Sequence, residues 1–292
     1  MFAKINDTEI FYDVAGAGLD ASSKSLKSKP VIIALNGGFG FDHGYLRLGL
    51  EDLSDDYQVI YTDMRGQGRS AKVKLSTITF EQMADDVATL MEYVGIDAGF
   101  IFGHASGSYI AQKVAMRHPE KVKGLILVAS SMGMTVLPDS EEEGFETPFL
   151  KDRADNDVLA TAHHFFYNAF DVTEDAFKDY SYQVGPYYLA PDNMGMCDRI
   201  RSYITYRMDL VNHFRRLNPF FNSKAKISQV ETPALICAGT YDWVSPAVGS
   251  SMLAKKMPNS TFMKFTESGH FAFLEEPQKF QEALHDFIGK AE

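Results

Sequence analysis

The stretch Ala98-Gly99-Phe100-Ile101-Phe102-Gly103-His104-Ala105-Ser106-Gly107 decides the fold of this chain. It begins with a short apolar run, residues 98–102, of the kind that forms a buried strand, and a helical pattern over residues 109–116 follows it. Gly103 and Gly107 stand two positions before and after Ala105, and small residues at these places let a strand turn sharply into a helix. The spacing therefore predicts a tight turn that holds residue 105 exposed in a strained conformation.

Residue 105 itself is the unexpected feature of this turn. Sharp strand-to-helix turns of this type present a catalytic nucleophile, for which the chemistry requires Ser, Cys or Asp. The methyl group of Ala105 can neither attack a substrate nor be activated. The next residue, Ser106, carries a hydroxyl. Because the residues two positions from it are His104 and Ser108 and not glycines, the tight-turn geometry favours position 105 as the nucleophile position.

Composition limits the classes of protein to which the chain can belong. It has 292 residues, of which 45% are hydrophobic and 23% charged, which suits one large α/β domain with an insertion or two small domains. The net charge of -11 argues against nucleic-acid and anionic-membrane partners, which need a basic face. No signal-peptide pattern or membrane-length apolar run occurs, so a cytoplasmic location is expected. Cys197 and Cys237 are expected to be structural thiols.

Strand and helix patterns alternate along most of the chain. Residues 2–16 suggest a hairpin around Asn6-Asp7, and residues 21–29 an exposed Ser/Lys-rich loop. Thr79 and Gln82 form a possible capping box at the start of a helix, and Pro277 opens the last helix. Short apolar strands are predicted over residues 31–35, 57–61, 98–102, 124–129, 234–238 and 261–265. This alternation predicts an α/β fold with a mostly parallel, doubly wound sheet.

The alternation of strand and helix patterns is interrupted between residues 132 and 230. This segment starts with an acidic run, residues 139–146, and continues with helical patterns that are rich in Phe and Tyr and lack a Val/Ile-rich strand. We interpret it as a helical cap inserted between two sheet strands. The expected organisation is therefore a core of residues 1–131 and 231–292 with a cap of residues 132–230.

Three positions that suit catalysis follow three different predicted strands: Ala105, Asp242 and His270. In open parallel sheets, the crevice beyond the carboxyl ends of the strands is where ligands bind. The order of nucleophile position, acid and histidine is that of the triad in α/β hydrolases. With the turn Gly239-Thr240-Tyr241-Asp242 and the segment Gly269-His270-Phe271, the chain resembles the α/β-hydrolase superfamily over essentially its whole length.

The resemblance implies a role for each site residue. In the family, such a histidine takes the proton of the nucleophile while the acid holds its tautomer and orientation, which assigns these roles to His270 and Asp242. The oxyanion hole is expected to use the N–H of Ser106 together with that of Gly38 or Phe39. This mechanism needs no cofactor. Because no Cys-x-x-Cys or His-Glu-x-x-His motif occurs, no metal is expected either.

Two segments resemble one group within the superfamily, the prolyl iminopeptidases. Asn36-Gly37-Gly38-Phe39-Gly40 is similar to their His-Gly-Gly-Pro-Gly loop, with Asn36 in place of His and Phe39 in place of Pro. The stretch from Asp63 to Ser70 is similar to their Asp-Gln-Arg-Gly turn. Those enzymes hold the free amine of their substrate with cap carboxylates, which the acidic run at residues 139–146 could supply, although such runs are usually solvated.

The aromatic cap favours a largely apolar, small-molecule substrate such as an ester, lactone or amide. Trp243, Tyr187 and Phe166 are the candidate substrate-binding residues. The expected function is that of a serine hydrolase acting by acyl transfer, present as an inactive Ser-to-Ala variant at position 105. The alternatives are a proline-type aminopeptidase, a non-catalytic receptor on the same fold, and a C–C bond hydrolase or lyase. Apart from a substrate, the only partner expected is a second copy of this chain in a homodimer.

Overall fold

The computed structural model describes residues 1–20, 26–133 and 149–292. The acidic run at residues 139–146 lies outside the described residues. No helix in the described part of the chain is long and apolar enough to cross a membrane.

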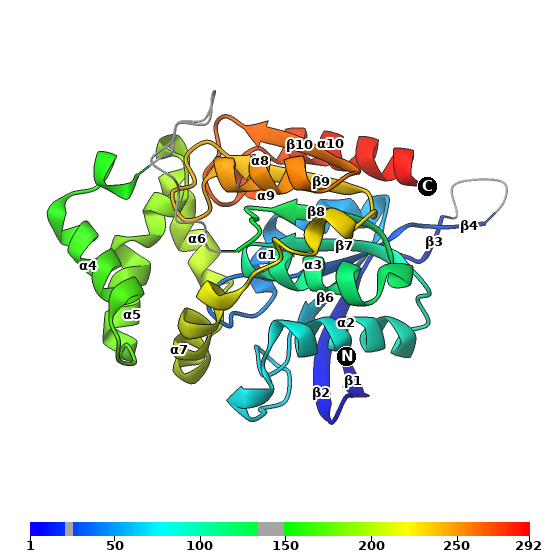
Figure 1. Cartoon of the computed structure of the whole chain (residues 1–292), viewed down its shortest axis with the longest axis horizontal. Coiled ribbons are helices and arrows are strands. Elements are labelled where there is room, and N and C mark those ends of the chain that lie inside the picture. Colours follow the sequence, from blue (N-terminus) through cyan, green and yellow to red (C-terminus); the bar gives the residue numbers. More distant parts are fainter. Residues whose placement is uncertain (21–25, 134–148) are drawn as a thin grey trace.

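An eight-stranded sheet forms the centre of the molecule (Figure 1). Its strand order is β1-β2-β6-β5-β7-β8-β9-β10. The pairs β1–β2 and β2–β6 are antiparallel, and every pair from β6 to β10 is parallel. The strands are β1 (Phe2–Ile5), β2 (Thr8–Ala15), β5 (Val31–Leu35), β6 (Gln58–Asp63), β7 (Gly99–His104), β8 (Val122–Val128), β9 (Ala234–Gly239) and β10 (Ser260–Phe265).

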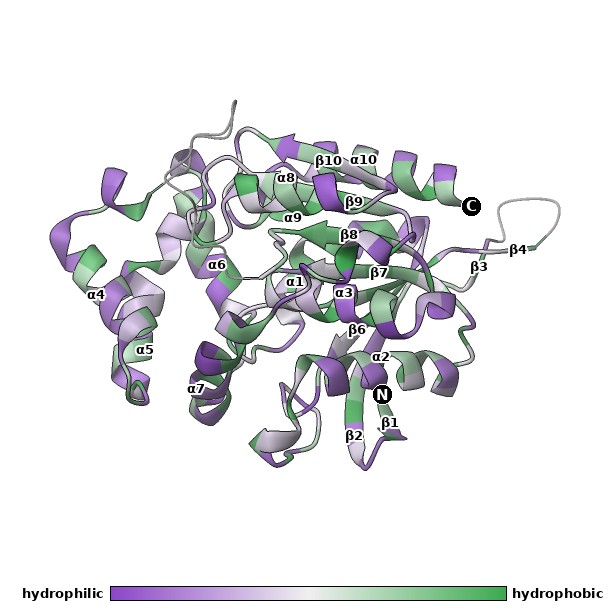
Figure 2. Cartoon of the chain, in the orientation of Figure 1, coloured by the Kyte–Doolittle hydropathy of each residue, from purple (hydrophilic) through white to green (hydrophobic). Residues whose placement is uncertain are grey.

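Helices cover both faces of this sheet. On one face lie α1 (Gly44–Leu50), α9 (Ala272–Glu275) and α10 (Pro277–Ala291), and their apolar residues form one hydrophobic core with the sheet. On the other lie α2 (Phe80–Tyr93), α3 (Ser106–Arg117) and α8 (Ala247–Lys256), which form a second core. The central strands are buried on both sides and mostly hydrophobic (Figure 2), which explains their continuous apolar sequences. The prediction of a mostly parallel, doubly wound sheet is confirmed.

Four α-helices lie between β8 and β9 in the described part of the chain, and we call this segment the cap. Its helices are α4 (Asn156–Tyr167), α5 (Glu174–Gln183), α6 (Cys197–Ser202) and α7 (Met208–Leu217). They sit beyond the end of the sheet to which β8 points, at the left of Figure 1. The cap has its own aromatic cluster, centred on Phe165, Phe177 and Tyr180, against which Phe39 and Trp243 of the core pack.

Short 3₁₀ helices fill several connections. They span Glu51–Asp55, Leu75–Thr77, Pro119–Lys121, Leu150–Asp152, Gly185–Tyr188, Pro191–Met196, Asn218–Phe220 and Ile227–Gln229. Pro119 starts a 3₁₀ turn directly after α3, as expected for a residue that cannot continue a helix.

Of the predictions for single segments, the structure confirms one and corrects two. The predicted hairpin is confirmed: Asn6 and Asp7 both have positive φ, 46° and 59°, which suits a tight turn between β1 and β2. The predicted loop over residues 21–29 is wrong in part, because β4 (Lys27–Ser28) pairs with β3 (Leu19–Asp20). Helix α3 starts at Ser106 and not at residue 109, since the sharp turn brings the helix directly onto the strand end.

Candidate active site

The turn at Ala105 has the strained conformation that its neighbours predict. Ala105 has φ 50° and ψ -119°, a conformation that side-chain-bearing residues rarely adopt and that costs on the order of 1–3 kcal/mol. A Cβ on Gly103 would lie 2.6 Å from the Gly107 carbonyl oxygen, and one on Gly107 would lie 2.3 Å from the Leu35 carbonyl oxygen. Only glycine therefore fits on either side of the turn.

Hydrogen bonds hold this turn against the neighbouring strand. The Ala105 N–H donates to the Val128 carbonyl over 2.9 Å. The Ala105 carbonyl accepts from the Ser108 N–H over 2.9 Å and from the Ser108 hydroxyl over 2.5 Å. Both backbone groups of residue 105 are thus satisfied, and its side chain is the one part of the residue that is free to face a substrate.

His270 and Asp242 meet as the sequence predicts. His270 Nδ1 lies 2.8 Å from Asp242 Oδ2, and both side chains are buried. The other carboxylate oxygen of Asp242 accepts the N–H groups of Val244, over 3.0 Å, and Ser245, over 2.8 Å. Because the carboxylate is held from both sides, it orients the His270 ring with Nε2 available for proton transfer.

The backbone around His270 is held just as firmly. Its N–H donates to the Tyr188 carbonyl of the cap over 2.7 Å. The N–H groups of the residues on either side, Gly269 and Phe271, donate to Glu275 Oε1 over 2.9 and 3.1 Å. Burial raises the pKa of Glu275, although these donors and the Ala190 N–H lower it in part. The Glu275 carboxyl group therefore joins the loop that carries His270 to Ala190 of the cap.

The predicted oxyanion residues lie beside the turn. A Cβ on Gly37 would lie 2.3 Å from the His104 carbonyl oxygen, so the glycine loop passes directly over the strand end. Gly38 has φ 87°, and its carbonyl accepts the Ser106 hydroxyl over 3.1 Å. The Ser106 N–H lies in the first turn of α3, where it has no partner within the helix. Because its hydroxyl is turned to the glycine loop, the geometry also favours position 105 over Ser106 as nucleophile position.

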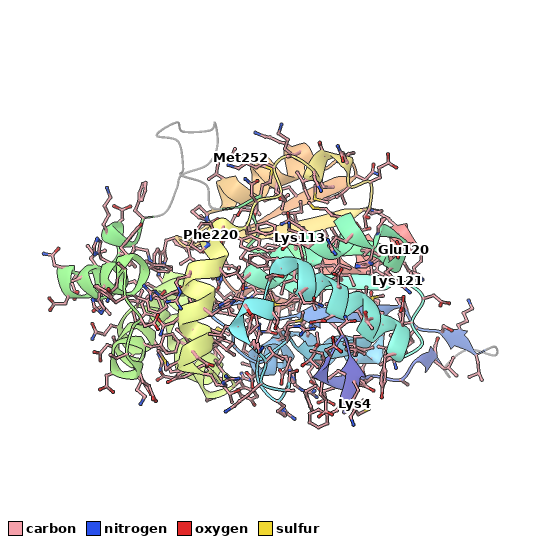
Figure 3. All side chains as sticks on the ribbon, turned by 60° about the horizontal axis from the view of Figure 1, so that its bottom comes forward. Lys4, Lys113, Glu120, Lys121, Phe220 and Met252 are labelled. Atoms are coloured by element: carbon pink, nitrogen blue, oxygen red, sulfur yellow. The ribbon has the colours of Figure 1, made fainter. Side chains whose placement is uncertain are left out.

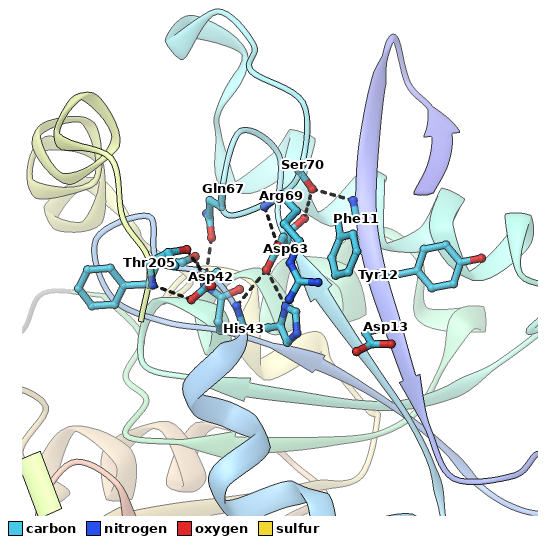
Figure 4. A network of polar contacts seen from close by, with 12 residues as sticks. Phe11, Tyr12, Asp13, Asp42, His43, Asp63, Gln67, Arg69, Ser70 and Thr205 are labelled. Carbon is cyan, nitrogen blue, oxygen red and sulfur yellow. Dashed lines mark hydrogen bonds and ion pairs between the residues drawn. The ribbon is translucent and has the colours of Figure 1, made fainter. Parts of the chain in front are cut away.

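The turn from Asp63 to Ser70 supports this glycine loop from below. The Asn36 side-chain amide donates to Gln67 Oε1 over 3.0 Å and to the Phe41 carbonyl over 2.6 Å. Asp63 in turn accepts from the backbone and ring N–H groups of His43 and from the Arg69 N–H (Figure 4). The turn is therefore a structural support of the loop.

A ring of the cap, Tyr188, packs against His270, and Trp243, which follows Asp242 in the sequence, packs against Tyr188. The centroid of the Tyr188 ring lies 5.3 Å from that of His270 and 5.6 Å from that of Trp243. Phe166 contacts Trp243 at 6.1 Å. Tyr187, one of the predicted substrate-binding residues, packs beside the Arg153 guanidinium at 5.8 Å. The ring against the histidine is thus Tyr188, which sequence reasoning missed because nothing in a Tyr-Tyr pair tells which ring points inward.

Three further features bear on the chemistry. Tyr188 and Tyr180 share a hydrogen bond between their hydroxyls, and burial raises the pKa of both phenols, so they stay protonated. Within the described residues, no three His, Cys, Asp or Glu side chains come together as metal ligands. Cys197 and Cys237 are free and buried, and burial raises the pKa of both thiols.

Comparison with known proteins places this geometry in a family. A family model described as the alpha/beta hydrolase fold matches residues 30–277. The chain belongs to the α/β-hydrolase fold family. Members of this family share the fold, whereas their substrates differ with the residues that line the site.

Relatives of known name cover nearly the whole chain. The putative carbamate hydrolase RutD of Azorhizobium caulinodans is 24% identical over 298 residues, covering 99% of this chain and 98% of the relative. The enol-lactonase of Burkholderia xenovorans LB400 superposes with a TM-score of 0.76 at 18% identity, covering 99% of this chain and 100% of that structure. A thermophilic esterase of Thermogutta terrifontis does so with a TM-score of 0.73 at 22% identity, covering 99% and 96%. The chain is thus an α/β-hydrolase-fold hydrolase.

Proposed function

We propose that this site performs acyl transfer on the carbonyl of a small, largely apolar ester, lactone or amide when a serine stands at position 105. The observation that carries the proposal is the His270–Asp242 pair, 2.8 Å apart and buried beside a strained turn at Ala105. A backbone strain of this size persists where the surroundings enforce it, and such strain is typical of functional sites.

The steps follow from the positions of the groups. A serine hydroxyl at position 105 gives its proton to His270 Nε2 while its oxygen attacks the substrate carbonyl carbon. The N–H groups of Ser106 and of Gly38 or Phe39 stabilise the resulting oxyanion. His270 then protonates the leaving group, and in the second half-reaction it activates the water that releases the acid. Asp242 keeps the proton of the ring on Nδ1 throughout.

With Ala105 in place, the same groups remain without the attacking atom. Removing the nucleophile of such a triad costs about a millionfold in rate. We therefore expect the present protein to bind its substrate and to turn it over barely. Whether position 105 was exchanged by design or lost its serine naturally, the proposal makes the same prediction for the Ala105→Ser variant.

The surroundings of His270 favour apolar acyl groups. Tyr188 packs against it, Trp243 packs against Tyr188, and Phe166 packs against Trp243. Phe39 of the glycine loop also packs against Phe165 of the cap, with ring centroids 4.9 Å apart. The names of the relatives add two candidate bond types, because one is a putative carbamate hydrolase and one an enol-lactonase.

The deciding experiment is a hydrolysis assay of the Ala105→Ser variant against p-nitrophenyl esters of several chain lengths, lactones, carbamates and proline arylamides. We expect turnover of one of the apolar ester or lactone classes by the Ser variant and almost none by the present protein. The matched control is the double variant Ala105→Ser with His270→Gln, which restores the hydroxyl but removes the base. Its rate should fall by about 10⁴-fold or more from that of the Ser variant.

Other outcomes would support the alternatives. Preferred cleavage of proline arylamides would favour the aminopeptidase, whose proposed amine ligands at residues 139–146 lie outside the described residues. Tight binding of a small molecule without turnover by the Ser variant, and without labelling by a fluorophosphonate probe, would favour a receptor. Ala105 is the observation behind the receptor alternative, because the site as it stands has no nucleophile.

A further inference from the structure

A chain of hydrogen bonds links the glycine loop to the histidine loop through the inside of the protein. The Gly37 N–H lies 2.7 Å from the Tyr45 hydroxyl, which lies 2.8 Å from His104 Nδ1. On the other side of the same ring, His104 Nε2 lies 2.9 Å from the His270 carbonyl oxygen. Tyr45 and His104 are each only 2% exposed, so no solvent competes for these bonds.

If the His104 ring is uncharged, only one arrangement of protons satisfies every bond in this chain. The His270 carbonyl can only accept, so His104 Nε2 must carry a proton. The Gly37 N–H can only donate, so the Tyr45 oxygen accepts from it and points its own hydrogen at His104 Nδ1. The direction of each bond is therefore fixed from Gly37 to Tyr45 to His104 and from His104 to His270.

The surroundings keep both side chains in the uncharged state that this arrangement needs. Burial lowers the pKa of His104 well below its ordinary value, and the nearby His270 lowers it further. Burial likewise raises the pKa of Tyr45, so its hydroxyl keeps its hydrogen. The His104 ring is packed against Phe271 and Phe273, with centroids 5.0 and 5.3 Å away, and it lies 4.7 Å from the His270 ring.

We propose that Tyr45 and His104 are positioning residues that hold the oxyanion loop and the catalytic histidine at a fixed separation on either side of the sharp turn at Ala105. The inference rests on the proposed function, because it assigns the pair a role in acyl transfer. His104 directly precedes Ala105, so one side chain links the strand end that carries the nucleophile position to both flanking loops. A neutral ring at this place also leaves His270 free to accept a proton, since a charged neighbour at 4.7 Å would oppose a second positive charge.

The first test needs no activity and uses the present protein. Nitrogen NMR of its histidines should show His104 protonated on Nε2 alone and still neutral at a pH where an ordinary histidine is charged. In Tyr45→Phe, the His270 Nδ1–H should exchange with solvent about tenfold faster, because the loop that carries His270 is then held less firmly. The matched control is Tyr57→Phe, because the Tyr57 hydroxyl makes a similar bond to His285 Nδ1, over 2.7 Å, at the opposite end of the sheet.

The second test measures kinetics in the Ala105→Ser background. Tyr45→Phe removes both buried hydrogen bonds of the hydroxyl and should lower kcat about tenfold, while KM stays nearly unchanged. Tyr57→Phe should change neither constant. His104→Gln should retain more activity than His104→Leu, because a glutamine amide can still donate to the His270 carbonyl and accept from Tyr45.

Two results would overturn the inference. One is a His104 ring that carries its proton on Nδ1 or becomes charged near pH 6.5. The other is a Tyr45→Phe variant that folds normally and matches Tyr57→Phe in His270 Nδ1–H exchange. If the Ala105→Ser protein turns nothing over, the proposed function fails, and the NMR experiment alone then decides whether the positioning role stands.

Discussion

At the scale of single residues, Ala105 shows that the turn is shaped by its neighbours and not by the residue at its tip. Its φ of 50° is unfavourable for alanine, yet the backbone adopts it because the flanking glycines let α3 pack onto the strand end. A replacement at position 105 therefore leaves the shape of the site intact. A replacement at a flanking glycine should not.

Gly107→Ala tests this directly. Its new Cβ would lie 2.3 Å from the Leu35 carbonyl oxygen and 2.6 Å from the Asn36 carbonyl oxygen, both backbone atoms that cannot turn aside. We expect the free energy of unfolding to fall by about 1–3 kcal/mol and activity regained in Ala105→Ser to be lost. Urea unfolding measures the first effect. Gly289→Ala is the control, because no atom lies within 4 Å of its Cβ in helix α10, and it should be neutral or stabilising.

At the scale of elements, α2 and α3 are joined by a charge cluster at their surface. Asp85 of α2 accepts two hydrogen bonds from Arg117 at the end of α3 and one from His118. The Arg117 hydrogen bonds lower the pKa of Asp85, partial burial opposes them, and His118 lowers it further. Because the folded state binds the proton of Asp85 less tightly, the carboxylate stabilises the fold above about pH 4. This stabilisation is lost as the pH falls through the lowered value.

Asp85→Asn should show this dependence on pH. At pH 7 we expect the free energy of unfolding to drop by about 0.5–1 kcal/mol, since the pair is partly exposed to solvent. The difference from the parent should shrink as the pH falls below about 4 and vanish once the pH is below the lowered pKa of Asp85, as followed by denaturant unfolding at several pH values. Asp286→Asn on α10 removes a single exposed pair with Lys290 and should change stability less. A constant difference at all pH values would contradict the ionic explanation.

At the scale of the whole molecule, the cap is tied to the core next to the candidate oxyanion loop. Asp42 accepts the Thr205 N–H over 3.0 Å and the Thr205 hydroxyl over 2.8 Å (Figure 4), and its own N–H donates to the Thr205 carbonyl over 3.2 Å. Thr205 lies between α6 and α7, and Asp42 follows the glycine loop directly. The end of α7 is less covered, because Phe220 beyond it (Figure 3) is 83% exposed.

Asp42→Ala should loosen this attachment. The N–H and the hydroxyl of Thr205 would lose their acceptor, and each of these partly buried hydrogen bonds contributes about 0.5–1.5 kcal/mol. We expect faster proteolysis between residues 197 and 217 and a higher KM in the Ala105→Ser background, with limited proteolysis and mass spectrometry as the measurement. Asp171→Ala is the control, because it breaks an exposed ion pair with Arg216 within the cap. Equal proteolysis of both variants would mean that Asp42 does not anchor the cap.

Features that depend on local order along the chain could be predicted from the sequence. Apolar runs and glycine spacing predicted the parallel sheet, the sharp turn at Ala105 and the strand ends that carry Asp242 and His270. These predictions hold because the carboxyl ends of parallel strands meet at one edge of a sheet, whatever the connections between them are.

Only the tertiary structure decided which side chains support these residues. Tyr188, rather than Tyr187, contacts His270, and Glu275 and the pair of Tyr45 and His104 hold its loop. No local pattern marks such residues, since each acts through a contact with a segment far away in sequence. Buried polar groups must find partners wherever packing brings the chain together, so their pairing is known only once the whole chain has folded.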